Sequence, residues 1–150
     1  MLQEIALRID LGMAHISVLV IVDGIVIPVP GASGELRIPS FIGFTSKNFC
    51  VDFEALKQHK SNLRNTVFGA KRLVERDIMS LPDTSIACLP FRLISENQLT
   101  KVEVRYGAHI RHFFLEEILS ISHLQGQRKG SSFSYKVSQT SCHWGPCPFQ

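Results

Sequence analysis

The sequence predicts a mixed α/β (α+β) fold. Its N-terminal part contains two apolar runs of strand length, Ile5 to Ile9 and Ile16 to Val22, and the second is rich in β-branched residues. Apolar residues recur at helical spacing between 67 and 74. Hydrophobic residues make up 45% and charged residues 19% of the 150-residue chain, which is typical of a folded domain long enough to bury a core.

The first strands are expected to form a hairpin. The run from Ile16 to Val22 is so uniformly apolar that we expect it to be covered on both faces. Asp23-Gly24 then fits a two-residue hairpin turn, and Ile25 to Ile27 continues as an antiparallel strand. Because Pro28 cannot donate a ladder hydrogen bond, this third strand is predicted to lie at the sheet edge or to end there.

The middle of the chain combines an extended segment with two short helices. Ile38 to Thr45 is predicted to be extended, and Asp52 to Gln58 to be a short helix. Asn65-Thr66 is a good helix start because either side chain can cap free amides, so a second helix is expected through Val74. Gly69 would then lie inside that helix, where glycine costs about 1 kcal/mol relative to alanine.

The C-terminal half contains the clearest strand pattern. Lys101 to Tyr106 alternates between apolar and charged residues, and Ile110 to Phe114 is expected to pair back on it. Glu116 and Glu117 suit the positive end of a helix. Residues 122–150 are rich in Ser, Gln, Gly, Lys and Arg, which predicts a mostly disordered tail.

Composition narrows the possible partners and cellular setting. The net charge of +3 is too small and too scattered to favour nucleic-acid binding, and the apolar runs are too short to cross a bilayer. The N-terminus has no secretory signal pattern and the four cysteines show no disulfide framework, so we expect a cytoplasmic setting. Zinc binding by Cys142, His143 and Cys147 with His123 is disfavoured because structural sites usually use closer ligand pairs.

Asp10-Leu11-Gly12 is the candidate functional motif. It ends one apolar run and precedes the next, so it predicts a tight turn between strands. The glycine would let the backbone approach phosphate oxygens, and the carboxylate could face hydrated magnesium. An ordinary turn is the alternative, because aspartate and glycine are common in turns of every kind.

Six segments in order resemble the N-terminal part of the seventy-kilodalton heat-shock chaperone family. They are Ile9-Asp10-Leu11-Gly12, Asp23-Gly24, Ile38 to Thr45, Asn65 to Leu73, Leu89-Pro90-Phe91 and Phe114 to Ile118. The resemblance implies a partial actin-like ATPase (ribonuclease H-like) fold of which this chain holds the first lobe only. It assigns 1–38 to the first core strands with a phosphate loop, 39–121 to a peripheral subdomain and the start of the next helix, and 122–150 to a divergent tail.

The same resemblance implies ATP or ADP with Mg²⁺ as ligand. Asp10 matches an aspartate that holds magnesium through water, and Gly12 matches the glycine of the phosphate loop. Lys71 matches the lysine that reaches the transferred phosphate, which makes it the candidate catalytic residue. The backbone amides of Met13, Ala14 and His15 would point at phosphate.

Several departures from the family pattern predict weak nucleotide contact. Met13 and Ala14 replace threonines, and each lost hydrogen bond to a charged ligand is worth roughly 1.5–3 kcal/mol. Further departures are Asp52-Phe53 for glycine-aspartate, Gly69 for aspartate, Glu75 for glycine and Leu115 for proline. The second lobe and the peptide-binding domain have no counterpart here, so the chain alone is expected not to hydrolyse ATP.

Three functional hypotheses follow. The chain retains some ATP contact of a chaperone nucleotide-binding domain, or it is a non-catalytic module that binds exchange factors, other chaperones or intact relatives. The third hypothesis is a truncated or pseudogene product without a function. Nucleic acid and membranes are not expected as partners.

Overall fold

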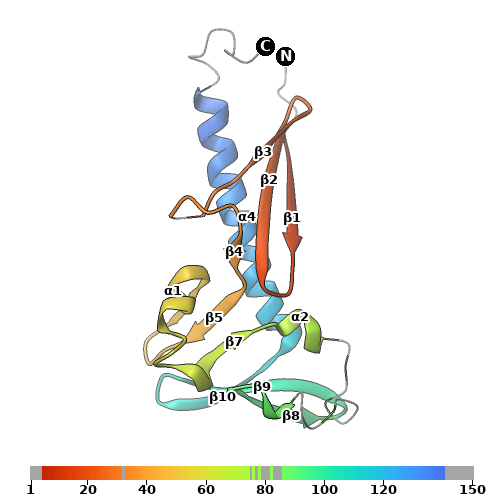
Figure 1. Ribbon diagram of the computed structural model, residues 1–150, viewed down its shortest axis with the longest axis vertical. Helices are drawn as coiled ribbons and strands as arrows, with labels where there is room; N and C mark the ends of the chain where they lie inside the picture. Colours follow the sequence, from red (N-terminus) through yellow and green to blue (C-terminus); the bar gives the residue numbers. More distant parts are fainter. Residues whose placement is uncertain are drawn as a thin grey trace.

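The computed structural model of the protein describes residues 5–31, 33–74, 76, 78, 82 and 86–140, with side chains described through residue 133. The described residues form three antiparallel sheets and a long C-terminal helix, which runs alongside the N-terminal hairpin (Figure 1). The predicted mixed α/β class is therefore confirmed. Among the described residues, no helix is long and apolar enough to span a membrane.

The N-terminal sheet is built around one central strand. Strand β2 (His15–Val22) pairs along one edge with β1 (Ile5–Leu11), while β3 (Ile25–Pro28) and β4 (Ile38–Pro39) pair with successive parts of its other edge. Alternate residues of β2 are buried and the residues between them are half-buried. We expected both faces of this strand to be covered. Only one face is fully buried, so the expectation was wrong for the other face. Pro28 ends a strand that pairs only with β2, so its predicted edge position is confirmed for the described residues.

Two smaller sheets complete the described strands. One contains β6 (Phe49–Val51), β5 (Phe41–Phe44) and β7 (Thr66–Phe68), and the other contains β10 (His109–Phe114), β9 (Leu99–Tyr106) and β8 (Arg92–Glu96). They share a core in which the ring of Phe44 stacks on Phe113 at 4.9 Å and meets Tyr106 edge-on at 6.0 Å. Helix α1 (Asp52–Gln58) and the 3₁₀ turn η1 (Leu63–Asn65) connect the strands.

The predicted helix from Asn65 to Val74 was partly wrong. Residues Thr66–Phe68 form β7 and pair with β5, and only Ala70–Leu73 form a helix, α2. Threonine and valine are β-branched and fit a strand better than a first helical turn. Gly69 adopts φ +64° before α2, so it is a left-handed hinge between strand and helix and not a helix-interior glycine.

The C-terminal helix corrects the predicted start of the disordered tail. Helix α4 spans Leu115–Thr140, so residues 122–140 are helical. Its start follows the prediction, with Glu116 and Glu117 in the first turn and the Phe114 backbone N–H donating to Glu117 at 2.8 Å. Residues 141–150, which include Cys142, His143 and Cys147, lie outside the described residues, as does Glu75.

Two glycines let α4 lie directly on the N-terminal hairpin. A Cβ added to Gly126 would lie 3.1 Å from the Ile9 Cγ2, and one added to Gly130 would lie 2.0 Å from a methyl group of Leu7. Phe133, further along the helix, packs against the core of the same sheet. The small residues that suggested disorder are therefore the residues that permit close packing.

An ion pair joins α4 to the start of α1. Asp52 adopts φ +61°, a left-handed conformation in a position where the family pattern has glycine. Its carboxylate pairs with the Lys129 ammonium, and the side chains are only 15% and 24% exposed. The pair thus links the later part of α4 to the first residue of α1.

The first prediction concerns this Asp52–Lys129 pair. Asp52→Asn keeps a residue type that tolerates the left-handed region, and Lys129→Met keeps the chain length without the charge. A double-mutant cycle measured by urea unfolding is expected to give a coupling of about 1 kcal/mol, because the pair is mostly shielded from water.

The matched control is the cycle on Arg92 and Glu103, whose arginine side chain is 72% exposed. Its coupling should be smaller. Equal couplings for the two pairs, or none for Asp52 and Lys129, would contradict a shielded ion pair between α4 and α1.

Candidate functional site

The candidate phosphate loop is the turn between β1 and β2. The Gly12 N–H donates to the His15 carbonyl at 2.9 Å, which closes the turn. A Cβ on Gly12 would lie 2.7 Å from that same carbonyl oxygen, so the turn is too tight for any side chain at this position. Among the described residues, the amides of Met13 and Ala14 make no hydrogen bond, which leaves them available to an anion.

Asp10 lies on the open face of the sheet. Ile9 contacts Gly126 of α4, and neighbouring strand residues point to opposite faces, so Asp10 points away from the helix. It pairs in register with Ser17, and its side chain is exposed with no ion pair to a described residue. A hydrated cation could reach this carboxylate without displacing a protein partner.

Lys71 is brought to this turn by the fold. The residue is the second of α2, and its Nζ donates to the Leu11 carbonyl at 2.7 Å across 60 positions of sequence. Gly69 directs α2 toward the turn through its left-handed backbone. The two parts of the predicted site therefore lie together, with a long cationic side chain held beside the candidate phosphate loop.

An apolar cavity lies next to the same turn. Its volume is about 300 Å³, and it is lined by Met13, Ala14, Phe41, Phe68, Gly69, Arg72, Leu73 and Leu89. Met13, which replaces a threonine in the resemblance, lines this cavity and is 56% exposed. An apolar lining disfavours a phosphate group that needs hydrogen-bond donors.

Arg72 is the residue near the site that sequence reasoning missed. It lines the apolar cavity beside Met13, whereas Lys71 bonds to the turn itself. Consecutive residues of a helix point about 100° apart. The two side chains therefore point to different places: Lys71 to the turn and Arg72 to the cavity. The adjacent Lys71-Arg72 pair in the sequence could have pointed to a second cation near the site. Only the structure shows that Arg72 lines the apolar cavity together with Phe41 and Leu89.

The predicted residues fit a nucleotide with magnesium only in part. Asp10, Gly12 and Lys71 supply a carboxylate, a close backbone approach and a positive charge, which are the groups such a ligand needs. Met13 and Ala14 supply amides but no hydroxyl groups. Magnesium, when bound, would neutralise phosphate charge, and the exposed Asp10 carboxylate would be the group to hold its water shell. No cluster of three or more His, Cys, Asp or Glu side chains that could hold a metal occurs in the described part of the chain.

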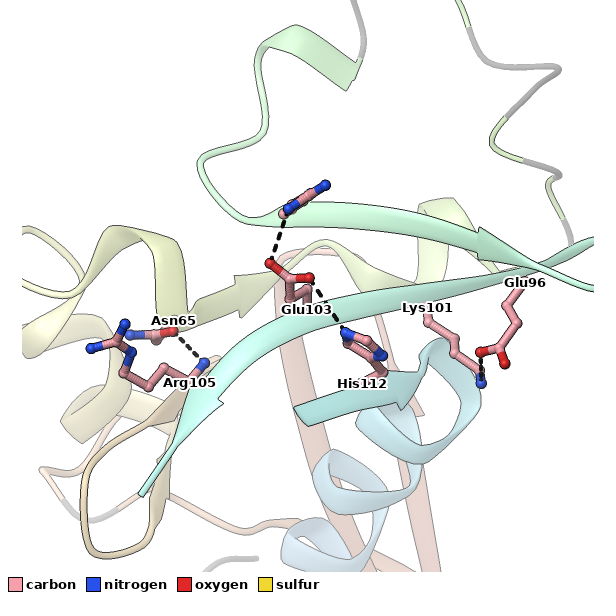
Figure 2. A network of polar contacts seen from close by, with 7 residues as sticks. Asn65, Glu96, Lys101, Glu103, Arg105 and His112 are labelled. Atoms are coloured by element: carbon pink, nitrogen blue, oxygen red, sulfur yellow. Dashed lines mark hydrogen bonds and ion pairs between the residues drawn. The ribbon is translucent and has the colours of Figure 1, made fainter. Parts of the chain in front are cut away.

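The groups with shifted pKa values lie elsewhere. Burial, and then the nearby Glu54 charge, raises the pKa of the Cys50 thiol, whose sulfur accepts a hydrogen bond from the Gln58 side chain at 2.6 Å. A hydrogen bond from Lys101 lowers the pKa of the exposed Glu96 carboxyl (Figure 2). The first shift keeps a buried thiol protonated and the second reflects a surface ion pair, so neither marks a catalytic group.

Comparison with known proteins identifies the family. The model of the Hsp70 protein family matches residues 6–128, which is most of the chain. This chain belongs to the Hsp70 family. The match extends past Ile121, where the family pattern was expected to end, and into the part of α4 that packs on β1.

Curated relatives agree with this assignment. The chain is 35% identical over 123 residues to "Putative heat shock 70 kDa protein 7" of Homo sapiens, covering 79% of this chain and 33% of that protein. It is 33% identical over 115 residues to a ribosome-associated molecular chaperone of Eremothecium gossypii, covering 75% of this chain and 18% of that protein. It is 30% identical over 99 residues to heat shock 70 kDa protein 13 of Homo sapiens, covering 64% and 21%.

The Hsp70 family assignment supports a chaperone-like, nucleotide-binding domain with the fold of a partial actin-like ATPase lobe. The chain spans a third or less of the length of these relatives. Hsp70 chaperones bind ATP, generally with Mg²⁺, and generally work with other chaperones and exchange factors. The roles of Asp10, Gly12, Met13, Ala14, His15 and Lys71 stay predictions.

Gly12→Ala tests the tightness of the candidate phosphate loop. The new methyl group would meet a backbone oxygen that cannot rotate away, so we expect a loss of about 1–3 kcal/mol in the free energy of unfolding. Urea unfolding monitored by circular dichroism measures it.

Gly31→Ala is the matched control because its Cβ would lie no closer than 3.4 Å to any neighbour. This variant should unfold near the wild-type midpoint. A Gly12→Ala protein as stable as the Gly31→Ala protein would show that the turn is looser than described.

Proposed function

We propose that this chain acts as one wall of a Mg²⁺-nucleotide site of Hsp70 type and contacts the phosphates of ATP or ADP weakly. Asp10 holds the water shell of magnesium, the amides of Met13, Ala14 and His15 face phosphate oxygens, and Lys71 supplies a positive charge. The proposal includes a cytoplasmic setting. It does not include ATP turnover by this chain alone.

The contact between Lys71 and the turn carries the proposal. Its Nζ lies 2.7 Å from the Leu11 carbonyl oxygen, between the candidate magnesium residue and Gly12. A lysine so close to a turn with unpaired amides creates a local positive potential, which is what an anionic phosphate group needs. Leu11 keeps the ammonium in place until a ligand replaces this single hydrogen bond.

The apolar cavity limits the strength of that contact. Met13 and Ala14 offer no side-chain donor, and the 300 Å³ cavity beside them is lined mainly by apolar side chains. Lys71 is exposed, so water screens its charge. We therefore expect an affinity in the millimolar range or weaker and not the tight binding of a closed two-lobed cleft.

Removing the Lys71 charge tests the nucleotide contact. Titration of the ¹⁵N-labelled protein with Mg-ATP is expected to shift the amide signals of Gly12, Met13 and Ala14. Lys71→Ala should weaken this response about tenfold, because it removes one charge-assisted interaction. Lys57→Ala is the control, since it removes an exposed lysine of α1 that is distant from the turn in sequence and contacts.

A second variant tests the same site by adding hydrogen-bonding groups instead of removing a charge. Met13→Thr combined with Ala14→Thr restores two hydroxyl groups and should strengthen the response. No signal shift with millimolar nucleotide in either the wild-type protein or this variant would end the proposal.

A non-catalytic interaction module is the second candidate function. Its support is the exposed apolar side chains of the first strands, with Ile5 39%, Ile25 67% and Val26 55% exposed. Surface of this kind is typical of a protein contact. An exchange factor, another chaperone or an intact relative would cover it, and binding to a purified exchange factor or Hsp70 separates this candidate from the first.

A further inference from the structure

A groove separate from the phosphate loop has a different chemistry. Its volume is about 660 Å³, and it lies between η1, the segment 89–92 and the paired strands β9 and β10. Arg64 and Asn65 border it on one side and Arg105 and Ile110 on another. The Asn65 side-chain oxygen accepts a hydrogen bond from the Arg105 backbone N–H at 2.8 Å, which fixes these two borders relative to each other (Figure 2).

Two arginines of this groove have no acidic partner in the described part of the chain. Arg64 and Arg105 are both exposed and form no ion pair. The carboxylate of the groove, Glu103, is already engaged, because one oxygen lies 3.4 Å from Arg92 and the other 3.3 Å from His112. Figure 2 shows the Arg105 side chain directed toward Asn65 and away from Glu103.

The groove also offers an apolar contact. Phe91 and Val104, which are 3% and 2% exposed, line it from the core side. Ile110 is 60% exposed and pairs in register with Arg105, so both side chains stand on the same face of the sheet. A large exposed isoleucine beside two free guanidinium groups is a surface that suits a ligand with both anionic and apolar parts.

We propose that this groove binds an extended acidic peptide in which Asp or Glu residues flank one large apolar side chain. Arg64 and Arg105 bind the carboxylates through their forked donors, and Ile110 packs against the apolar side chain. The groove offers only two unpaired arginines among its described residues, which is fewer than the long basic track that a continuous phosphate backbone needs. A protein segment therefore fits better than a nucleic acid.

Fluorescence anisotropy with a fluorescein-labelled Asp-Glu-Asp-Leu-Asp-Glu-Asp peptide tests the proposal on the full chain without nucleotide. Because no nucleotide is present, the result is independent of the proposed phosphate site. We expect weak, saturable binding that decreases with salt. Replacing both Arg64 and Arg105 by glutamine should weaken it about tenfold or more, since two charge-assisted interactions are lost.

Arg111→Gln is the matched control. It removes the same charge from an exposed residue of β10, but its neighbour in register is Val104, so it stands on the opposite face from Arg105. This variant should change the affinity less than about twofold. Circular dichroism of all variants shows whether each is folded, and a single Arg64→Gln variant replaces the double variant if that one is not.

Three outcomes would overturn the proposal. They are no binding of the acidic peptide, equal weakening by Arg111→Gln and by the groove variant, and tighter binding of a single-stranded oligonucleotide than of the peptide. An Asp-Glu-Asp-Ser-Asp-Glu-Asp peptide that binds as well as the leucine peptide would remove the role of Ile110.

Discussion

Helix α4 connects the two hydrophobic cores, and the position of Lys71 beside the candidate phosphate loop depends on this connection. Its first turns bury Leu115 and Ile118 in the core shared by the two smaller sheets, and its later turns pack against β1 and β2 through Gly126 and Gly130. Because one continuous helix contacts both cores, the hairpin is held at a set distance from α2. The hydrogen bond between Lys71 and Leu11 follows from that arrangement, since neither residue is near the other in sequence.

The sequence allowed prediction of elements whose signal is local. The hairpin of β2 and β3 and the strand from Lys101 were predictable because alternation and turn residues lie within a few positions. Thr66 to Phe68 was mistaken for helix because its partner, β5, lies more than twenty positions earlier. Residues 122–140 were mistaken for a disordered tail because their high content of Ser and Gly was taken as a sign of disorder. In the structure this segment is helical, and two of its glycines fit against Ile9 and Leu7.

The candidate site was predictable in its residue types but not in its surroundings. Asp10 and Gly12 were predicted from the turn between two apolar runs and Lys71 from resemblance to the heat-shock chaperone family, and the fold places Lys71 beside the turn. The apolar cavity was not predictable, since Phe41 and Leu89 come from distant strands and loops. The groove around Arg105 was likewise hidden, because it depends on the register that sets Ile110 opposite that arginine.

The two surfaces differ in how they would hold an anion. At the turn, a single lysine and a few amides face solvent, and the neighbouring cavity is lined mainly by apolar side chains. A phosphate bound there would receive few hydrogen bonds in place of those it makes to water. At the groove, two guanidinium groups without acidic partners among the described residues stand beside an exposed isoleucine, so an acidic peptide gains hydrogen bonds and apolar contact together. Because the planar fork of arginine loses less freedom per hydrogen bond formed than a lysine ammonium, we expect the groove to be the better organised of the two proposed surfaces.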